Sequence, residues 1–306
     1  MRLWINLIGL YAIWFIAYNT WPWGVIIVVA LGFVIAAFAV WSSRSNRQQS
    51  ARVRPPVGGS SRTAPSKIQL KESTVTTMTA ATQPVSILCA VEQLSPSIMH
   101  RSGSLFYSAP SAFQGERPLY VLGLNPGGSP VAQTAETVER DLADWRALTL
   151  PWSAYLDESW QGKPAGTHGM QSRMRHMFDR LGLDLREVPA SNVVFVRSAT
   201  EAALASEKAE LLEQCWPVHA AVIRDLGIRT ILCLGTTAGR WTREAIRAHK
   251  LIDRFQESND RGWASEAHVA ADGRAVVTVT HPGRADWRNP AADPTPLVRA
   301  VLERQQ

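Results

Sequence analysis

The stretch PLYVLGLNPGGSP, residues 118–130, decides the fold that the sequence predicts. Its hydrophobic part, LYVLGL (119–124), is continuous rather than alternating. Such a run is typical of a strand that is buried on both faces, as in a parallel sheet. The run ends at an Asn-Pro-Gly-Gly sequence, residues 125–128, whose glycines allow another group to approach the backbone closely. The stretch therefore predicts a buried strand with a binding loop at its carboxyl end.

Strands and helices are expected to alternate along the rest of residues 85–306. Three further runs of β-branched and aliphatic residues are NVVFV (192–196), TILCLG (230–235) and AVVTVT (275–280). Helical patterns lie between the strands, at residues 170–183, 206–228 and 237–252, and Pro217 predicts a kink or the start of a second helix. This alternation predicts an α/β fold, a three-layer α/β/α sandwich with a central four-stranded parallel sheet. Ligands of such sheets bind beyond the carboxyl ends of the strands.

Two uncharged apolar runs, residues 3–18 and 24–41, precede this domain. Each is near the ~17–25 residues that a spanning helix needs, and NTWPW (19–23) between them is a turn with interfacial tryptophans. Residues 1–41 are therefore predicted to form two transmembrane helices; a buried hairpin in a soluble core is the alternative. Arginines follow the second run and are absent from the turn, which predicts an inner-membrane location with both termini and the soluble domain in the cytoplasm. These arginines are also expected to contact anionic lipid headgroups.

The formal charge of +6 belongs to the N-terminal part of the chain. Eight of the 32 basic residues precede Glu72, the first acidic residue, which leaves 24 basic and 26 acidic residues for the remainder. Residues 42–84 are rich in Ser, Thr, Arg and Pro and are interpreted as a basic linker. Because the domain itself is nearly neutral, net charge alone does not identify it as a nucleic-acid binder.

Several common catalytic and cofactor motifs are absent from the sequence. There is no P-loop, G-x-S-x-G or H-E-x-x-H motif, and GLNPGG lacks the dinucleotide-binding spacing G-x-G-x-x-G. The three cysteines, Cys89, Cys215 and Cys233, are widely spaced and predict reduced thiols rather than disulfides. The spacing of cysteine and histidine predicts no metal site.

Residues 117–306 resemble the uracil-DNA glycosylase superfamily through four segments in the family's order. These are GLNPG (123–127), SNVVFVR (191–197), QCWPVHAAVIRDLGIRTILCLGTTAG (214–239) and HPGRADWR (281–288). The first is similar to the G-[IL]-N-P-G motif of the mismatch-specific uracil and thymine glycosylases, and the third is similar to a segment of the four-cysteine bacterial branch. Only Cys215 matches one of that branch's cluster ligands, so no iron–sulfur cluster and no other cofactor are expected.

The resemblance implies a role for each residue of the expected site. Asn125 would hold the attacking water and His281 would donate a hydrogen bond to the departing base, and these two are the expected catalytic residues. Asn192 would read the edge of a pyrimidine. The expected substrate-binding residues also include Gly123, Leu124, Pro126, Gly127, Gly128 and Tyr155, the last as one of several aromatic candidates for stacking on the base.

DNA contacts are expected from Arg284, Trp287, Arg288 and Arg197. The family usually has Ser at the position of Gly283 and a leucine wedge nearby; this chain has Arg284 and Trp287 near the missing wedge. Each expected site residue also has a structural interpretation. Asn125 is a common turn residue, His281 can cap a loop, and the tryptophans can pack in the core.

The sequence thus predicts a membrane-anchored DNA glycosylase that hydrolyses the N-glycosidic bond of a flipped uracil-type or modified base. Its partner would be single- or double-stranded DNA, and its placement suggests defence against foreign DNA. Two alternatives stay open: a catalytically weak or inactive sensor of nucleic acid or nucleotides at the membrane, and a hydrolase of free nucleosides or nucleotides.

Overall fold

The computed structural model describes residues 85–305. The predicted transmembrane helices in residues 1–41 and the linker at 42–84 lie outside the described residues. Within the described part of the chain, no helix is long and apolar enough to cross a membrane.

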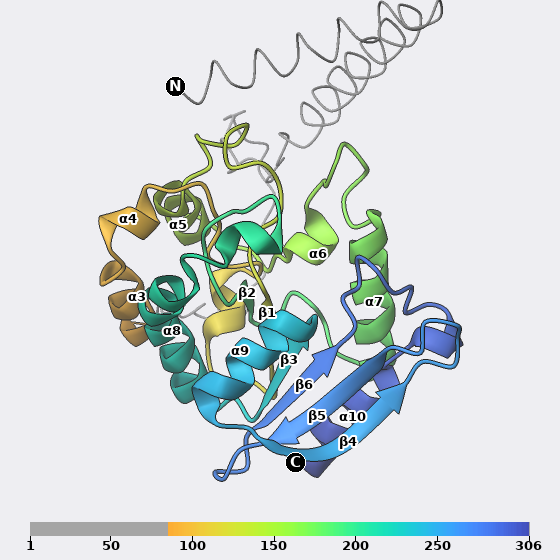
Figure 1. Cartoon of the computed structure of the whole chain (residues 1–306). Helices are drawn as coiled ribbons and strands as arrows, with labels where there is room; N and C mark the ends of the chain where they lie inside the picture. The colour runs from red at the N-terminus through yellow and green to blue at the C-terminus, as the bar shows by residue number, and fades with distance from the viewer. Residues whose placement is uncertain (1–84, 306) are drawn as a thin grey trace, which may run out of the picture. The chain divides into compact units, whose positions relative to one another are not determined.

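One mixed sheet of six strands organises the described residues, in the order β2-β1-β3-β6-β5-β4 (Figure 1). The strands are β1 (Leu119–Gly123), β2 (Ala190–Asn192), β3 (Thr230–Leu234), β4 (Lys250–Gln256), β5 (Ala264–Val269) and β6 (Ala275–Val279). Strands β2, β1, β3 and β6 are parallel to one another, whereas β5 pairs antiparallel with both β6 and β4. The sheet is therefore mostly parallel, with an antiparallel hairpin at one edge.

The predicted four-stranded parallel sheet was incomplete. Its four strands exist, although β2 begins at Ala190 and ends at Asn192, earlier than predicted. The predicted helix at 237–252 ends at Ile246, and Lys250 starts β4. The hairpin strands escaped prediction because β4, at the edge, mixes charged and apolar residues and is mostly exposed or half-buried. Such a strand lacks the continuous hydrophobic run of a doubly covered one.

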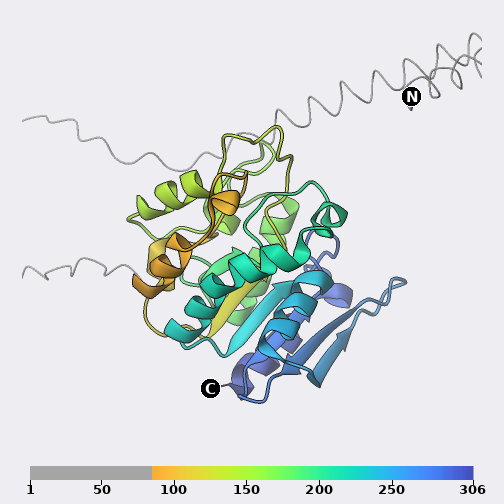
Figure 2. The ribbon, with the colours of Figure 1, turned by 60° about the vertical axis from the view of Figure 1, so that its left-hand side comes forward.

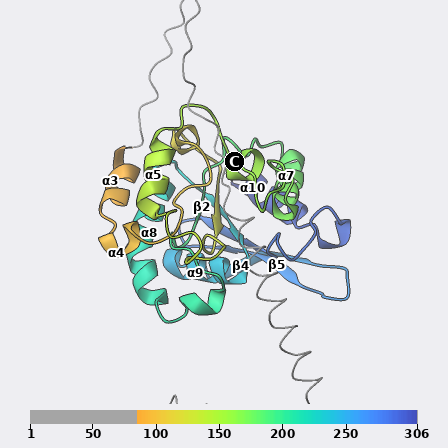
Figure 3. The ribbon, with the colours of Figure 1, turned by 90° about the horizontal axis from the view of Figure 1, so that it is seen from above.

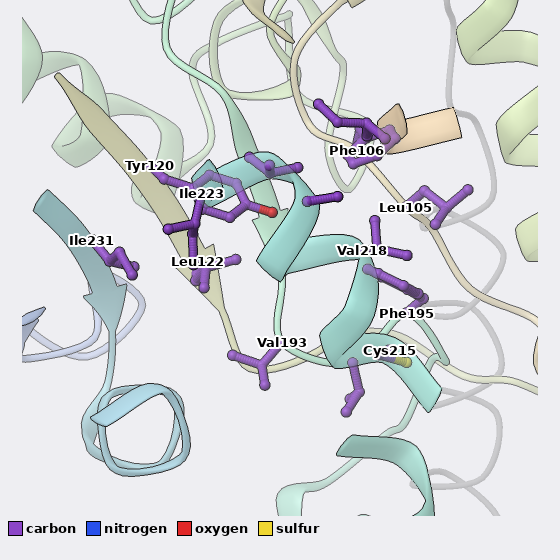
Figure 4. Packing of buried hydrophobic residues seen from close by; sticks show 14 of the residues in the cluster. Leu105, Phe106, Tyr120, Leu122, Val193, Phe195, Cys215, Val218, Ile223 and Ile231 are labelled. Atoms are coloured by element: carbon purple, nitrogen blue, oxygen red, sulfur yellow. The ribbon is translucent and has the colours of Figure 1, made fainter. Parts of the chain in front are cut away.

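Helices cover both faces of the sheet. Successive side chains of a strand point to opposite faces, so a continuous hydrophobic strand needs packing partners on both. On one face, Tyr120, Ile231 and Val276 join a core with α3 (Val85–Glu92), α8 (Lys208–Asp225) and α9 (Thr236–Ile246). On the other face, Val121 and Leu232 join a core with α7 (Gly169–Leu181) and α10 (Thr295–Arg304). Figure 3 shows the two groups of helices on opposite sides of the strands, and Figure 4 shows side chains of the first core.

The helices begin and end at residues that suit these positions. His168 caps the amino end of α7 in a capping box with Gln171, and Gly182 ends the helix in the left-handed region at φ 71°. Helix α8 is a single helix of 18 residues in which Pro217 lies, so Pro217 starts no second helix. The remaining helical segments are α4 (Pro96–Met99), α5 (Val138–Arg146), α6 (Ala154–Asp157), η1 (Pro110–Phe113), η2 (Glu201–Leu204) and η3 (Pro290–Ala292).

Candidate functional site

The residues expected to act together follow the carboxyl ends of the parallel strands. Asn125 lies just after β1, Asn192 ends β2, Gly235 follows β3 and His281 comes two residues after the end of β6. Since these four strands are adjacent and run in the same direction, their carboxyl ends lie along one edge of the sheet (Figure 1). The chain thus brings the expected catalytic and base-reading residues to the same edge.

The loop after β1 is fixed by hydrogen bonds from the segment that follows β2. Four of its carbonyl groups accept a hydrogen bond from residues 193–198: Gly123 from Val193 N (2.9 Å), Leu124 from Val194 N (3.0 Å), Pro126 from Ser198 N (3.2 Å), and Gly127 from Arg197 Nη1. Gly128 has φ 109°, a conformation that side-chain-bearing residues rarely adopt. The Asn-Pro-Gly-Gly loop is therefore held from its carbonyl side.

Asn125 presents a hydrogen-bond acceptor. Its Nδ2 donates to Pro126 O at 2.8 Å and to Ser198 O at 3.4 Å, which fixes the amide orientation. Its Oδ1 has no hydrogen-bond partner within residues 85–305, and the residue is half-buried. An amide oxygen can orient a water molecule by accepting one of its hydrogens, but it does not take the proton as a carboxylate does.

Asn192 lies directly against Gly123 of the neighbouring strand, with which it is in register. A Cβ atom at position 123 would overlap Oδ1 of Asn192, so glycine is what lets the Asn192 side chain lie over β1. Asn192 is 5% exposed, and its Nδ2 has no hydrogen-bond partner within the described residues. A buried donor left unsatisfied costs about 1–3 kcal/mol, and a carbonyl group of a ligand would satisfy it.

His281 is held as a neutral imidazole with its proton on Nε2. The backbone N–H of Gly283 donates to Nδ1 at 2.9 Å, so Nδ1 carries no proton. Burial, and secondly the positive charge of Arg284, lower the pKa of His281 below its usual value. At neutral pH the Nε2–H group is therefore available to donate to a ligand. The ring lies against Gly235, which adopts φ 105°.

Arg197 is buried and does not lie on a DNA-facing surface. Its side chain is 3% exposed and forms an ion pair with Glu136, Nη2 to Oε2, at 2.9 Å. It also donates to Ser102 Oγ at 3.1 Å and to the carbonyl of Gly127. This position supports a role in holding the Asn-Pro-Gly-Gly loop rather than the predicted contact with DNA.

Trp287 and Tyr155 are also core residues. Trp287 is 0% exposed, and its indole N–H donates to Thr280 O at 3.1 Å. Tyr155, 2% exposed, packs beside Tyr107 and Trp160 with ring centroids 5.8 Å away in each case, and burial raises its pKa. Neither side chain is open to a DNA strand or a base in this arrangement. The burial of Trp287 agrees with the alternative structural interpretation, in which the tryptophans pack in the core.

The two other predicted DNA contacts lie at the surface. Arg284 and Arg288 are exposed. Arg288 forms an ion pair with Asp286, Nη2 to Oδ2, at 2.8 Å. Arg288 and, to a smaller extent, Arg173 lower the pKa of Asp286. No ion pair joins Arg284 to a carboxylate of residues 85–305. Arg284 is thus the expected DNA-contacting residue whose charge is most available.

His219, a buried residue of α8, links the helix to the strands that carry the site. Its Nε2 lies 3.1 Å from Val193 O, which can only accept, so Nε2 carries the proton and Nδ1 accepts from the Tyr120 hydroxyl at 2.8 Å. Burial lowers the pKa of His219 to about 4. His219 therefore joins α8 to β1 and to the residue after Asn192. No motif pointed to this role, since it depends on a contact between distant segments.

Fold and site together define a mixed α/β domain with a polar site at the carboxyl ends of its parallel strands. Neither the protein-family models nor the curated proteins with which the chain was compared give a match. The described residues contain no group of three or more His, Cys, Asp or Glu side chains that could hold a metal ion. Cys215 and Cys233 are buried, which raises the pKa of both thiols to about 12.

Proposed function

We propose that the chain is a DNA glycosylase of the uracil-DNA glycosylase type, which hydrolyses the bond between a flipped pyrimidine-type base and its sugar. The observation that carries this proposal is the buried, unsatisfied Nδ2 of Asn192, which a carbonyl oxygen of the base would satisfy. The Gly123–Asn192 register and the neutral His281 at the same edge of the sheet support it.

The reaction would divide between two residues. A water molecule, oriented by Oδ1 of Asn125, attacks C1′ while the bond from C1′ to the base nitrogen breaks and its electron pair leaves with the base. Negative charge then develops on the base oxygen, to which the Nε2–H of His281 donates. The proton of the attacking water passes to solvent or to the departed base, because Asn125 cannot take it. Catalysis therefore depends mainly on stabilising the leaving group.

An excision panel tests this proposal. The full-length chain is incubated with single- and double-stranded oligonucleotides that carry uracil, mismatched thymine or modified bases, and abasic product is measured after strand cleavage. His281→Ala and Asn125→Ala should lose activity, whereas His249→Ala, an exposed histidine outside the site, should retain it. If no substrate yields an abasic site while DNA is bound, the proposed reaction is wrong.

A nucleic-acid or nucleotide sensor with little catalysis is the second candidate. The observation in its favour is that Arg197 and Trp287 are buried, which leaves few side chains to hold a duplex open. A sensor would bind the oligonucleotides of the panel, or free nucleotides, with no product. Incubation with free nucleosides and nucleotides also separates the hydrolysis of monomers, which needs no wedge between stacked bases.

We further propose that the protein is anchored in the inner membrane through residues 1–41, with the catalytic domain in the cytoplasm. The two uncharged apolar runs and the arginines after them support this placement. Cell fractionation should recover the full-length chain with the inner membrane after an alkaline wash. Recovery in the soluble fraction would contradict the placement.

A further inference from the structure

We propose that the tip of the β4–β5 hairpin, residues 257–263, is a stacking platform for an unpaired base that flanks the base in the site. This inference rests on the proposed function for the identity of its ligand, a single-stranded stretch of nucleic acid. The connection between β4 and β5 projects from the domain in two different views (Figures 2 and 3). Trp263 at its end is 38% exposed, although large hydrophobic side chains are usually covered.

Trp263 is held rigidly from one side. The guanidinium carbon of Arg261 lies 4.5 Å from the centroid of the Trp263 ring, over its face. Arg261 is itself fixed by Glu257, Nη2 to Oε2 at 2.8 Å, whose side chain is fully buried. Asn259 Nδ2 donates to the same carboxylate oxygen at 2.9 Å. A buried carboxylate therefore holds the arginine that supports the ring, so little side-chain freedom remains to be lost on binding.

The tip is also fixed to the loop that carries His281. Arg261 Nη1 donates to Arg284 O at 2.8 Å, and Ser258 N donates to Ala291 O at 2.9 Å. The stacked Arg261–Trp263 pair therefore lies beside the segment His281–Arg288, near the carboxyl end of β6. A strand whose base enters the site near His281 would pass close to this pair.

The charges around the tip favour a base over a row of phosphates. Arg261 is neutralised by Glu257 and Arg288 by Asp286, and the tip also carries the exposed carboxylate of Asp260. With so little net charge, the tip would not follow a phosphate backbone. Stacking of a base on an aromatic ring is worth about 1–3 kcal/mol and does not depend on charge.

Binding to an undamaged, fluorescently labelled single-stranded oligonucleotide tests the platform. Trp263→Ala in the full-length chain should raise Kd by about 10-fold or more. Trp263→Phe, which keeps an aromatic face, should restore most of the affinity. Leu251→Ala is the matched control, because Leu251 is 50% exposed and lies at the other end of the hairpin. Thermal unfolding shows whether each variant is folded.

The salt dependence distinguishes stacking from phosphate contact. Trp263→Ala should leave the slope of log K against log salt unchanged, whereas loss of one phosphate contact lowers a single-strand slope by about 0.7. An unchanged Kd for Trp263→Ala overturns the proposal. Binding to anionic lipid vesicles is measured in parallel, and a variant that weakens only vesicle binding also overturns it. Because this oligonucleotide carries no excisable base, a loss of binding upholds the platform even if the excision panel yields no product. If the excision panel yields product but Trp263→Ala binds the oligonucleotide normally, the stacking platform is wrong and the proposed reaction still stands.

Discussion

The hydrogen bond from Gly283 fixes the His281 ring only while His281 is neutral, because a protonated Nδ1 can no longer accept it. Its folded-state pKa is lower than that of the unfolded chain, so the neutral form persists below pH 6.5 and is lost as the pH falls through the folded-state pKa. Protonation of Nδ1 would break the hydrogen bond from Gly283 and turn the ring. We expect the rate of excision to stay flat from about pH 8 through pH 6.5 and to fall only below this, as the pH passes through the lowered folded-state pKa. Initial rates across a pH series measure this; a rate that rises on acidification would contradict the role of the neutral ring.

Removal of the His281 side chain should affect catalysis far more than binding. The loss of one donor to a developing oxyanion lowers the rate by about 10²–10³-fold in other enzymes. His281→Ala should therefore reduce the single-turnover rate by that factor while the Kd for uncleaved DNA changes less than 3-fold. Equal losses of rate and of affinity would instead indicate a residue that binds the ground state.

The Asn192 amide is expected to contribute little to the stability of the domain and to act mainly in binding the substrate base. Because Nδ2 is buried without a partner, Asn192→Ala removes an unsatisfied donor and should change the free energy of unfolding by less than about 1 kcal/mol. Most truncations of a buried side chain are more destabilising than this. The same variant should lose binding of the substrate base. Chemical denaturation and the excision panel measure the two effects; a loss of stability of several kcal/mol would show that the amide is structural.

At the scale of the strands, Gly123 and Asn192 should behave as one unit. A Cβ atom at position 123 would overlap the Asn192 side chain, so Gly123→Ala should destabilise the domain by about 1–3 kcal/mol. In the double variant Gly123→Ala with Asn192→Ala, the overlap is gone and most of that loss should be recovered. A double-mutant cycle on unfolding free energies tests the coupling. Additive effects would mean that the close approach of β1 and β2 at this point does not involve the amide.

His219 should make the packing of α8 against β1 sensitive to acid. The unfolded chain binds the proton more readily than the folded one, because burial lowers the folded-state pKa to about 4. Its contribution is complete above pH 6.5 and is lost as the pH falls toward 4, and its size is on the order of 3 kcal/mol. The pH dependence of unfolding should be flatter in His219→Gln over this window. An unchanged pH dependence would contradict the buried neutral state.

Strands were predictable where a local hydrophobic run was sufficient evidence, whereas contacts between side chains from distant segments were not predictable. LYVLGL forms β1 because a continuous hydrophobic run is typical of a strand that is covered on both faces. Asn125 and His281 were predicted as site residues from the resemblance and from their positions after such strands, and the structure places both beyond the carboxyl ends of the strands. The burial of Arg197 could not be foreseen, because its partner Glu136 lies 61 residues away along the chain. The same holds for Trp287, whose place in the core depends on packing between distant segments.

At the scale of the whole molecule, the proposed anchor and the weakly charged domain suggest a common purpose. A general repair enzyme gains from access to the whole chromosome, so attachment to the membrane would hinder it. Attachment would help an enzyme that meets DNA as it crosses the envelope, and a nearly neutral domain would not be held on bulk duplex by charge alone. We therefore propose that the protein acts against incoming foreign DNA.

Deletion of residues 1–41 separates location from chemistry. Because the site lies wholly within residues 85–305, the shortened chain should excise bases from oligonucleotides at a rate within about 2-fold of the full-length rate. Protection of cells against phage infection or plasmid entry should nevertheless fall to that of cells that carry His281→Ala. Plaque counts and transformation efficiencies at matched protein levels measure this. If the shortened chain protects as well as the full-length one, the membrane has no part in the function; if His281→Ala also protects, binding rather than excision is the activity that matters.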